Sequence, residues 1–161
     1  MEGLEGRSAI VTGGSTIIGR AVVRELHGRG AAVTIADIDP TGGEELAQEL
    51  GERVLFTRTD ITDDGRLEAC VADAVGRFGG LDIVVNLAAT YLDEGVASPR
   101  DDWLKALDVN VVSAVMLVRA ARPHLVGRGG GAVVNFTSIS SKVAQTGRWL
   151  YPVSKAALVQ L

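Results

Sequence analysis

The chain has 161 residues, of which 47% are hydrophobic and 4% aromatic, so it is long enough to bury one core without disulfides. Its net charge of −4 leaves no basic stripe to neutralise phosphates, which argues against a nucleic-acid partner. The single cysteine, Cys70, excludes an intrachain disulfide, and we expect it to be a buried thiol. No apolar run reaches the ~20 residues of a membrane span, and the N-terminus carries no apolar signal segment. We therefore expect a cytoplasmic protein with no membrane partner.

Short runs rich in valine and isoleucine alternate with amphipathic segments along the chain. The runs are apolar on both faces, as is typical of parallel strands covered by helices on both sides. Repeated strand–helix–strand units with right-handed crossovers predict an α/β fold with a doubly wound parallel sheet, forming one domain over residues 1–161. The longest helix is expected over about residues 101–125. The expected strands span residues 9–12, 32–37, 54–58, 83–86 and 132–137.

A glycine-rich turn lies between the first expected strand and the first expected helix, from Thr12 to Gly19. Such a turn places backbone N–H groups and a helix N-terminus against a pyrophosphate. The alternative is an ordinary turn between strand and helix, but the strand before and the helix after favour a dinucleotide site. The residues assigned to it are Gly13, Ser15, Ile17, Ile18 and Gly19.

Two carboxylates follow the second and third strands. Asp37 ends the second strand, where it would accept the ribose hydroxyls of an adenosine and repel a 2′-phosphate. No lysine or arginine flanks it, so the sequence predicts NAD in preference to NADP. Asp60 and Ile61 follow the third strand, where Asp60 would accept the adenine amino group. A helix N-cap is an equally good interpretation of Asp60.

Tyr151 and Lys155 are four residues apart, which places them side by side on one face of a helix. A lysine held near a tyrosine favours the phenolate and lets the phenol exchange a proton near neutral pH. Ser138 closes the fifth strand, and its hydroxyl could hydrogen-bond a substrate oxygen. These three residues indicate an acid/base site that interconverts an alcohol and a ketone. The alternative is a half-buried tyrosine beside a solvated lysine.

Together these features resemble the short-chain dehydrogenase/reductase family, compact oxidoreductase branch, over nearly the whole chain. The resemblance implies a Rossmann-type fold that binds NAD and requires no metal. It implies that Tyr151 exchanges a proton with the substrate oxygen, that Lys155 holds the nicotinamide ribose and lowers the phenol pKa, that Ser138 orients the substrate and that Asn110 anchors a water that relays the proton. It also implies a homo-oligomer formed through the helix over 101–125 and the helix that carries Tyr151. The residues matching the family's motifs are Thr12, Gly13, Gly19, Asp60, Asn86, Ala88, Asn110, Ser138, Tyr151 and Lys155.

The chain departs from the family at three places. Ile17 stands where the family has a glycine, and a β-branched residue is poorly suited to a positive φ, so we expect weakened or displaced cofactor binding. Leu87 replaces an asparagine after the fourth strand, at a small expected cost. The chain stops at Leu161, within the helix of Tyr151, so that the family's two further strands are missing. The fifth strand then becomes an open apolar edge, which a partner covers unless the chain is a fragment of a longer protein.

Two hypotheses follow. The leading one is an NAD-dependent oxidoreductase that transfers a hydride between nicotinamide and a secondary alcohol or ketone, with Tyr151 as the acid/base. The competing hypothesis is a truncated, non-catalytic nucleotide-binding or dimerisation module, which Ile17, Leu87 and the early stop favour.

Overall fold

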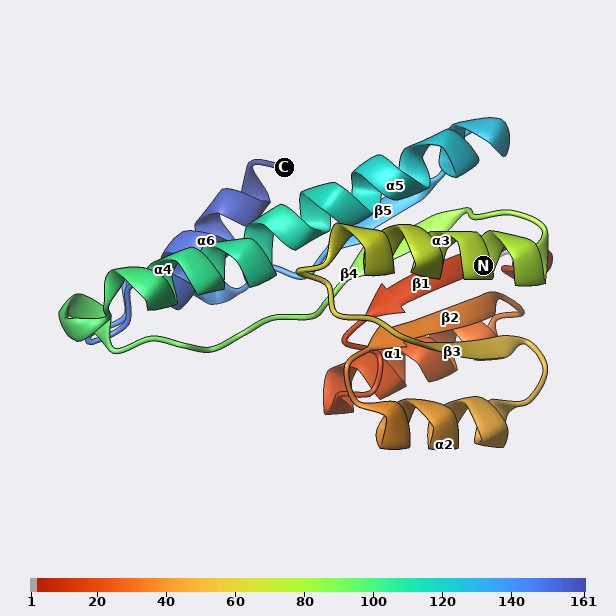
Figure 1. Ribbon diagram of the computed structural model, residues 1–161, viewed down its shortest axis with the longest axis horizontal. Helices are drawn as coiled ribbons and strands as arrows, with labels where there is room; N and C mark the ends of the chain where they lie inside the picture. The colour runs from red at the N-terminus through yellow and green to blue at the C-terminus, as the bar shows by residue number, and fades with distance from the viewer. Residues whose placement is uncertain (1–2) are drawn as a thin grey trace.

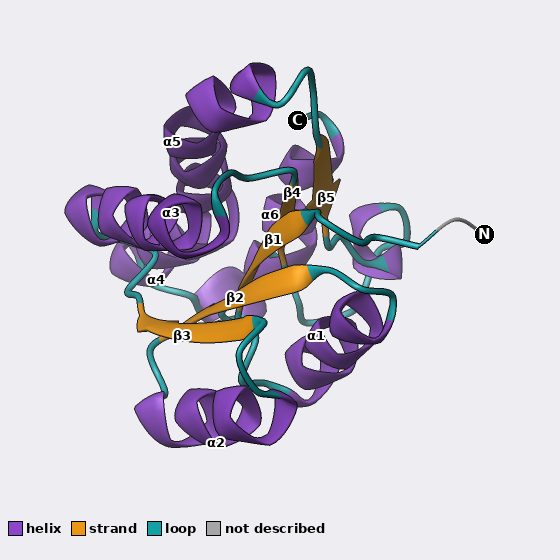
Figure 2. Ribbon diagram, turned by 90° about the vertical axis from the view of Figure 1, so that its right-hand side faces the viewer, coloured by secondary structure: helices purple, strands orange, loops and turns teal. Residues whose placement is uncertain are grey.

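The computed structural model describes residues 3–161, which form a five-stranded parallel sheet with helices on both faces (Figures 1 and 2). The strand order is β3-β2-β1-β4-β5, so the order reverses beside β1, where an open α/β sheet forms its ligand crevice. The predicted doubly wound fold is confirmed. The strands are β1 Ser8–Thr12, β2 Ala32–Asp37, β3 Val54–Arg58, β4 Ile83–Asn86 and β5 Ala132–Asn135.

Two hydrophobic clusters fill the space between the sheet and its two helical layers. One packs α3 (Asp64–Phe78) and α5 (Ser113–Gly127) against one face. It contains Ile10, Leu117 and the buried Cys70 predicted from sequence. The other packs α1 and α2 against the opposite face, around Val23 and Ile35. Among residues 3–161, no helix combines the length and apolar character needed to cross a bilayer. The helices are α1 Ile17–Gly28, α2 Pro40–Leu50, α3 Asp64–Phe78, α4 Arg100–Leu107, α5 Ser113–Gly127 and α6 Leu150–Val159.

The helix predicted over residues 101–125 is present but contains a π-helical turn, Asp108–Val112, between α4 and α5. The hydroxyl of Ser113, the first residue of α5, donates to the Val109 carbonyl of this turn at 2.6 Å. π-Turns inside α-helices are frequently found at functional sites. This one contains Asn110, and α6 packs against it and against α4.

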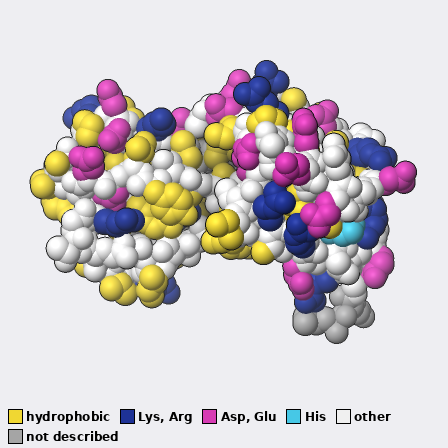
Figure 3. Space-filling view, turned by 90° about the horizontal axis from the view of Figure 1, so that it is seen from below, with side chains coloured by type: hydrophobic (Ala, Val, Ile, Leu, Met, Phe, Trp, Pro, Cys, Tyr) yellow, Lys and Arg dark blue, Asp and Glu magenta, His cyan; other side chains and the backbone are white. Residues whose placement is uncertain are grey.

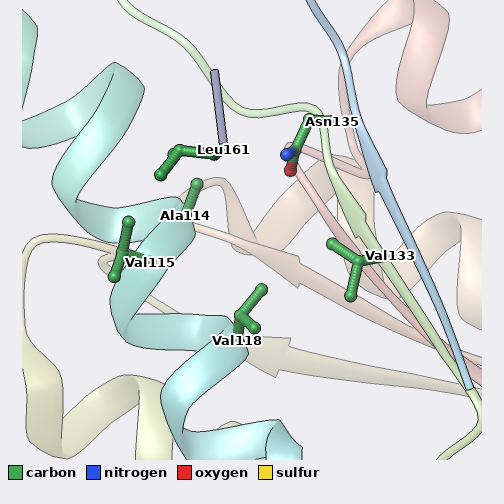
Figure 4. Close-up of a pocket in the computed structure, with 6 residues that line it drawn as sticks. All are labelled: Ala114, Val115, Val118, Val133, Asn135 and Leu161. Carbon is green, nitrogen blue, oxygen red and sulfur yellow. The ribbon is translucent and has the colours of Figure 1, made fainter. Parts of the chain in front are cut away.

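Strand β5 forms an exposed edge of the sheet, as predicted. Val133 and Val134 are 41% and 44% exposed, whereas every residue of β1 is buried. The expectation that all five strands are covered on both faces is therefore wrong for β5. Beside it lies a cavity of about 230 Å³ between β5, α5 and the end of the chain (Figure 4). Its lining residues are Ala114, Val115, Val118, Val133, Asn135 and Leu161.

Asp82, just before β4, joins the start of β1 to the end of α5 through one buried carboxylate. Its Oδ1 accepts from Arg7 Nη1 at 2.7 Å and from Arg128 Nε at 3.2 Å, and its Oδ2 accepts from the backbone N–H of Ser8 at 3.0 Å. Burial alone would raise the pKa of Asp82, but the bonds from Arg7, Ser8 and Arg128 outweigh it and lower the pKa. A carboxylate with a lowered pKa stabilises the fold above its unfolded pKa of about 3.9, and this stability is lost as the pH falls through the folded value.

Asp82→Asn is therefore expected to lower the free energy of unfolding at neutral pH by about 1–3 kcal/mol, because it removes the charged acceptor of the buried Ser8 N–H and of two partly exposed arginines. The free energy of unfolding of this variant should also fall less steeply than that of the parent below about pH 4, because the titrating carboxylate is gone. Urea denaturation at a series of pH values measures both effects. Glu25→Gln is the matched control, because it removes a carboxylate from an exposed i,i+4 pair with Arg29, a loss of about 0.5 kcal/mol or less. Equal losses in the two variants would contradict the prediction.

Candidate active site

The turn between β1 and α1 is closed by its own backbone and by Thr16. Gly13 has a φ of 67°, and a Cβ added to it would lie 2.9 Å from Ala88 Cα. The Thr16 hydroxyl caps α1: it accepts from the N–H of Gly19 at 3.2 Å and donates to the Gly13 carbonyl at 2.7 Å. A Cβ on Gly19 would overlap that same carbonyl oxygen. Glycine is thus sterically required at both ends of this turn.

The backbone strain that the sequence predicted at Ile17 is absent from the structure. Ile17 is the first residue of α1, and no described residue other than glycine has a positive φ. The expectation of a strained backbone at Ile17 is wrong, because Ile17 does not have the positive φ that a β-branched residue rarely adopts. Its side chain is 91% exposed, and Ile18 is 56% exposed. Neither of them lines the cavity beside Asp37, and of the other predicted nucleotide residues Ser15, Gly19 and Asn86 do not line it either.

Asp37 lies buried at the end of β2, where backbone N–H groups hold its carboxylate. Oδ2 accepts from Ser15 at 2.9 Å and Oδ1 accepts from Asp39 at 3.1 Å. Each oxygen keeps a lone pair that could accept from a ribose hydroxyl. The carboxylate borders a cavity of about 220 Å³ at the carboxyl ends of the strands. The predicted residues that line this cavity are Gly13, Asp37, Asp60, Ile61 and Ala88.

Asp60 forms a turn with Thr62 and does not cap a helix. Its Oδ1 accepts from the Thr62 backbone N–H at 3.0 Å and from the Thr62 hydroxyl at 2.7 Å, and these bonds lower the pKa of Asp60. The N-cap of α3 is Asp63, which accepts from Arg66 N at 3.1 Å. The N-cap interpretation of Asp60 is therefore wrong, and Asp60 is one of the residues that line the cavity.

Thr12, at the end of β1, fixes the segment that follows β4. Its hydroxyl oxygen accepts from the backbone N–H groups of Leu87 and Ala88, at 3.1 and 3.2 Å. These are main-chain contacts, so they do not depend on which side chain stands at position 87. Asn86 instead donates from Nδ2 to Asn135 Oδ1 on β5 at 2.9 Å. This role of Thr12 was not predicted from the sequence, although its place at the end of a strand beside β4 was the available signal.

Ser138, Tyr151 and Lys155 come together beyond the end of β5. Ser138 precedes the 3₁₀ turn Ile139–Ser141, and the other two lie on α6. Lys155 is 3% exposed; its Nζ donates to the Phe136 carbonyl at 2.8 Å and lies 5.7 Å from the centroid of the Tyr151 ring. The ring of Tyr91 stacks on Tyr151 with centroids 5.0 Å apart. The alternative of a solvated lysine is wrong.

The predicted lowering of the phenol pKa by Lys155 is not found in the protein alone. Burial raises the pKa of Tyr151; the Ser138 hydroxyl opposes this rise and the Tyr91 hydroxyl adds to it. Burial also lowers the pKa of Lys155, whose ammonium is turned toward a backbone carbonyl. Desolvation of the phenol is therefore the largest influence on its pKa, and Tyr151 is protonated at neutral pH.

Asn110 links the π-turn to α6. Its Oδ1 accepts from Thr90 N at 2.7 Å, and its Nδ2 donates to Thr90 O at 3.1 Å and to Ser154 Oγ at 2.9 Å. The Ser154 hydroxyl in turn donates to the Tyr151 carbonyl at 2.8 Å. Asn110 thus connects to the backbone of Tyr151 through one buried hydroxyl. Sequence reasoning missed Ser154, because a serine beside Lys155 has no signal of its own; the water-anchoring role of Asn110 stays a prediction.

Comparison with known proteins places these features in one family. The profile of the family described as short chain dehydrogenase matches residues 7–161. The chain is 33% identical to an uncharacterized oxidoreductase of Thermotoga maritima, over 98% of this chain and 63% of that protein. It is also 33% identical to a 3-hydroxyacyl-CoA dehydrogenase type-2 of Drosophila melanogaster, over 94% of this chain and 64% of that protein.

A solved structure agrees with the sequence comparison. It is a 7α-hydroxysteroid dehydrogenase complexed with NADH and 7-oxo glycochenodeoxycholic acid, which superposes with a TM-score of 0.94 at 28% identity. The alignment covers 98% of this chain and 63% of that one. The chain thus spans a little under two thirds of the length of the proteins it matches. Its sequence and its fold agree that it belongs to the short-chain dehydrogenase family.

Proposed function

We propose that the protein is an NAD-dependent oxidoreductase that interconverts a secondary alcohol and a ketone, with Tyr151 as the acid/base. The observation that carries this proposal is the grouping of Ser138, Tyr151 and the buried Lys155 within one small region. A chain that used Tyr151 and Lys155 only for packing would not need a buried ammonium next to a phenol, because a buried charge is costly. The family's activity is consistent with this grouping.

Each residue of the group has a chemical role in the proposal. The protonated Tyr151 donates to a ketone oxygen, and in the reverse direction the phenolate accepts the proton of the alcohol. Ser138 donates a hydrogen bond to the same substrate oxygen. Lys155 supplies positive charge that stabilises the phenolate once it forms. Asn110 holds α6 against the π-turn through Ser154, and so keeps the phenol in place.

The cavity beside Asp37 fits the adenosine half of a dinucleotide. It offers a carboxylate already oriented by Ser15 and Asp39, with apolar walls that include Ile61 and Ala88. Gly13 and Gly19 keep the two ends of the turn beside it free of side chains. When the dinucleotide is bound, its nicotinamide ring provides the site that gives or receives the hydride. The negative charge of Asp37 favours NAD, because it would repel a 2′-phosphate.

Asp37→Ala should weaken NAD binding by about tenfold and narrow the preference for NAD over NADP, because it removes the acceptor of the ribose hydroxyls and the repelling charge together. Calorimetric titration with both dinucleotides measures the two dissociation constants. Asp64→Ala, a carboxylate in the first turn of α3, is the control and should leave both constants unchanged. An unaltered ratio of the two constants in Asp37→Ala would assign the preference to another residue.

The proposed activity is tested by incubating the chain with NAD and a panel of secondary alcohols while following the absorbance of NADH. Turnover that requires Tyr151 supports the proposal. Saturable NAD binding without turnover by any alcohol would favour the second candidate, a non-catalytic nucleotide-binding or dimerisation module. The observation in favour of that candidate is the uncovered edge at β5.

The surface at the α4 and α6 end supports a homo-oligomer in either case. Hydrophobic side chains gather on this part of the molecule, whereas charged side chains are denser at the opposite end (Figure 3). Leu104, Trp149 and Val153 are 59%, 50% and 46% exposed, and exposed apolar side chains that gather in one place mark interaction sites. Sedimentation velocity tests the proposal, and a monomer at high concentration would refute it.

A further inference from the structure

Asp93 lies in the loop between β4 and α4 and binds a helix more than fifty residues away in the sequence. Its Oδ1 accepts from the backbone N–H groups of Trp149 at 2.9 Å and Gly95 at 3.0 Å. Its Oδ2 accepts from the backbone N–H of Tyr151 at 3.0 Å. Both carboxylate oxygens are thus used to hold the start of α6.

Helix α6 has no side-chain cap of its own. Trp149 occupies the N-cap position, and its side chain makes no capping bond. The first N–H groups of a helix have no partner within the helix, and a negative charge is favoured at this end by the helix dipole. Asp93 satisfies these groups from outside the helix. Leu150, between the two N–H groups, is fully buried, so the first turn of α6 is fixed from both sides.

The same loop contacts α6 and its neighbours at two further points. The ring of Tyr91 stacks on the ring of Tyr151. Thr90 binds both ends of the Asn110 amide through its backbone N–H and carbonyl. The segment over residues 90–93 is therefore a clamp that joins the end of β4 to the first turn of α6 and to the π-turn.

We propose that Asp93 is a positioning residue that sets the place of the Tyr151 phenol relative to Ser138 and Lys155. The proposal rests on the proposed function, in which that phenol exchanges a proton with substrate. Proton transfer needs donor and acceptor within hydrogen-bond reach, and a misplacement of about 1 Å can reduce a rate about 10²-fold. Because Tyr151 lies in the turn that Asp93 caps, a loss of the cap acts on the phenol directly.

The charge state of Asp93 suits this role. Burial alone would raise its pKa, but the backbone N–H groups of Trp149, Gly95, Tyr151 and Leu150 outweigh burial and lower the pKa. The side chain is therefore a carboxylate at neutral pH, able to accept at both oxygens. An asparagine would keep one accepting oxygen and place an amide donor against a backbone N–H. An alanine would keep no hydrogen-bond acceptor.

The first test does not depend on turnover. The chain has two tyrosines, so in a Tyr91→Phe background the ultraviolet absorbance of tyrosinate reports Tyr151 alone. Asp93→Ala is expected to lower the apparent pKa of Tyr151 toward its ordinary value, because the loosened turn exposes the phenol and a nearby negative charge is removed. In Asp93→Asn the apparent pKa of Tyr151 should lie between the values of Asp93→Ala and of the parent. This variant provides the comparison if Asp93→Ala fails to fold. Asp63→Ala removes the corresponding cap of α3 and should leave the titration unchanged.

The second test uses kinetics. If the chain turns over an alcohol, Asp93→Ala should lower kcat at least tenfold with little change in the dissociation constant of NAD, and Asp93→Asn should restore part of kcat. A Tyr151 titration that is the same in Asp93→Ala, Asp63→Ala and the parent would overturn the positioning role. A chain without turnover in which Asp93→Ala still shifts the titration would refute the proposed function and leave the positioning role standing.

Discussion

Tyr151→Phe is expected to lower kcat by about 10²–10⁴-fold, the usual contribution of a general acid or base, with little change in the affinity for NAD. The substitution removes the hydroxyl and keeps the ring, so the stack with Tyr91 at 5.0 Å between centroids is preserved. The bonds of the residue to Asp93 and Ser154 are made by its backbone N–H and carbonyl, and they remain. The variant therefore removes the proton-transferring atom and little else.

Steady-state kinetics with NAD and an alcohol substrate would measure this effect, and calorimetry would show that the cofactor still binds. Tyr91→Phe deletes the chain's other phenolic hydroxyl, from a side chain that is 64% exposed. We expect it to cost less than tenfold in kcat, since the ring stack on Tyr151 remains and only a hydroxyl that raises the phenol pKa is removed. If both variants kept the parent's kcat, the proton would be moved by another group and the proposed mechanism would be wrong.

The strands of the sheet were predicted well because each strand is marked by residues that are close together in the sequence. Each strand combines an apolar run with flanking turn residues, and the observed β2, β3 and β4 agree with the predicted spans residue for residue. The turn at Gly13 and the carboxylate at Asp37 were predictable for the same reason, since each follows a strand whose end lies at the crevice.

The parts that sequence reasoning missed depend on contacts between distant segments. Asp93 is 58 residues from Tyr151, and Asn110 is 44 from Ser154, so neither pair has a spacing that could be recognised. The raised pKa of Tyr151 was missed because the spacing to Lys155 shows proximity of a charge but not the burial that opposes it. Strand β5 has the apolar composition of a covered strand, and composition alone does not show whether a covering layer is present.

Gly19→Ala is expected to damage the dinucleotide site and the stability of the fold together. A Cβ at this position would overlap the Gly13 carbonyl oxygen and lie 2.7 Å from Gly14 Cα. Both are backbone atoms, so no side chain can rotate away to make room. The Gly13 carbonyl also accepts from the N–H and the hydroxyl of Thr16, at 3.1 and 2.7 Å. The methyl group must therefore displace a carbonyl on which the N-terminus of α1 depends.

Alanine is favoured over glycine inside a helix by about 1 kcal/mol, and overpacking costs about 1–3 kcal/mol, occasionally more. At Gly19 we expect the cost of overpacking to exceed the gain in helix propensity. The free energy of unfolding should fall by about 1–2 kcal/mol, and the affinity for NAD should be at least tenfold weaker. Gly28→Ala, at the other end of α1, is the matched control, because a Cβ there has no heavy atom within 4 Å. It should keep the affinity and gain up to about 1 kcal/mol.

Urea denaturation and calorimetric titration on the two alanine variants separate helix propensity from loop geometry. The two substitutions are chemically identical and lie on one helix, so propensity alone predicts the same sign for both. Opposite signs, with the loss of NAD affinity confined to Gly19→Ala, would show that the turn is shaped by close backbone packing. A gain of stability in both variants would mean that the turn can relax around a methyl group. Gly19 would then be dispensable for binding, and the affinity would depend mainly on Asp37 and the cavity beside it.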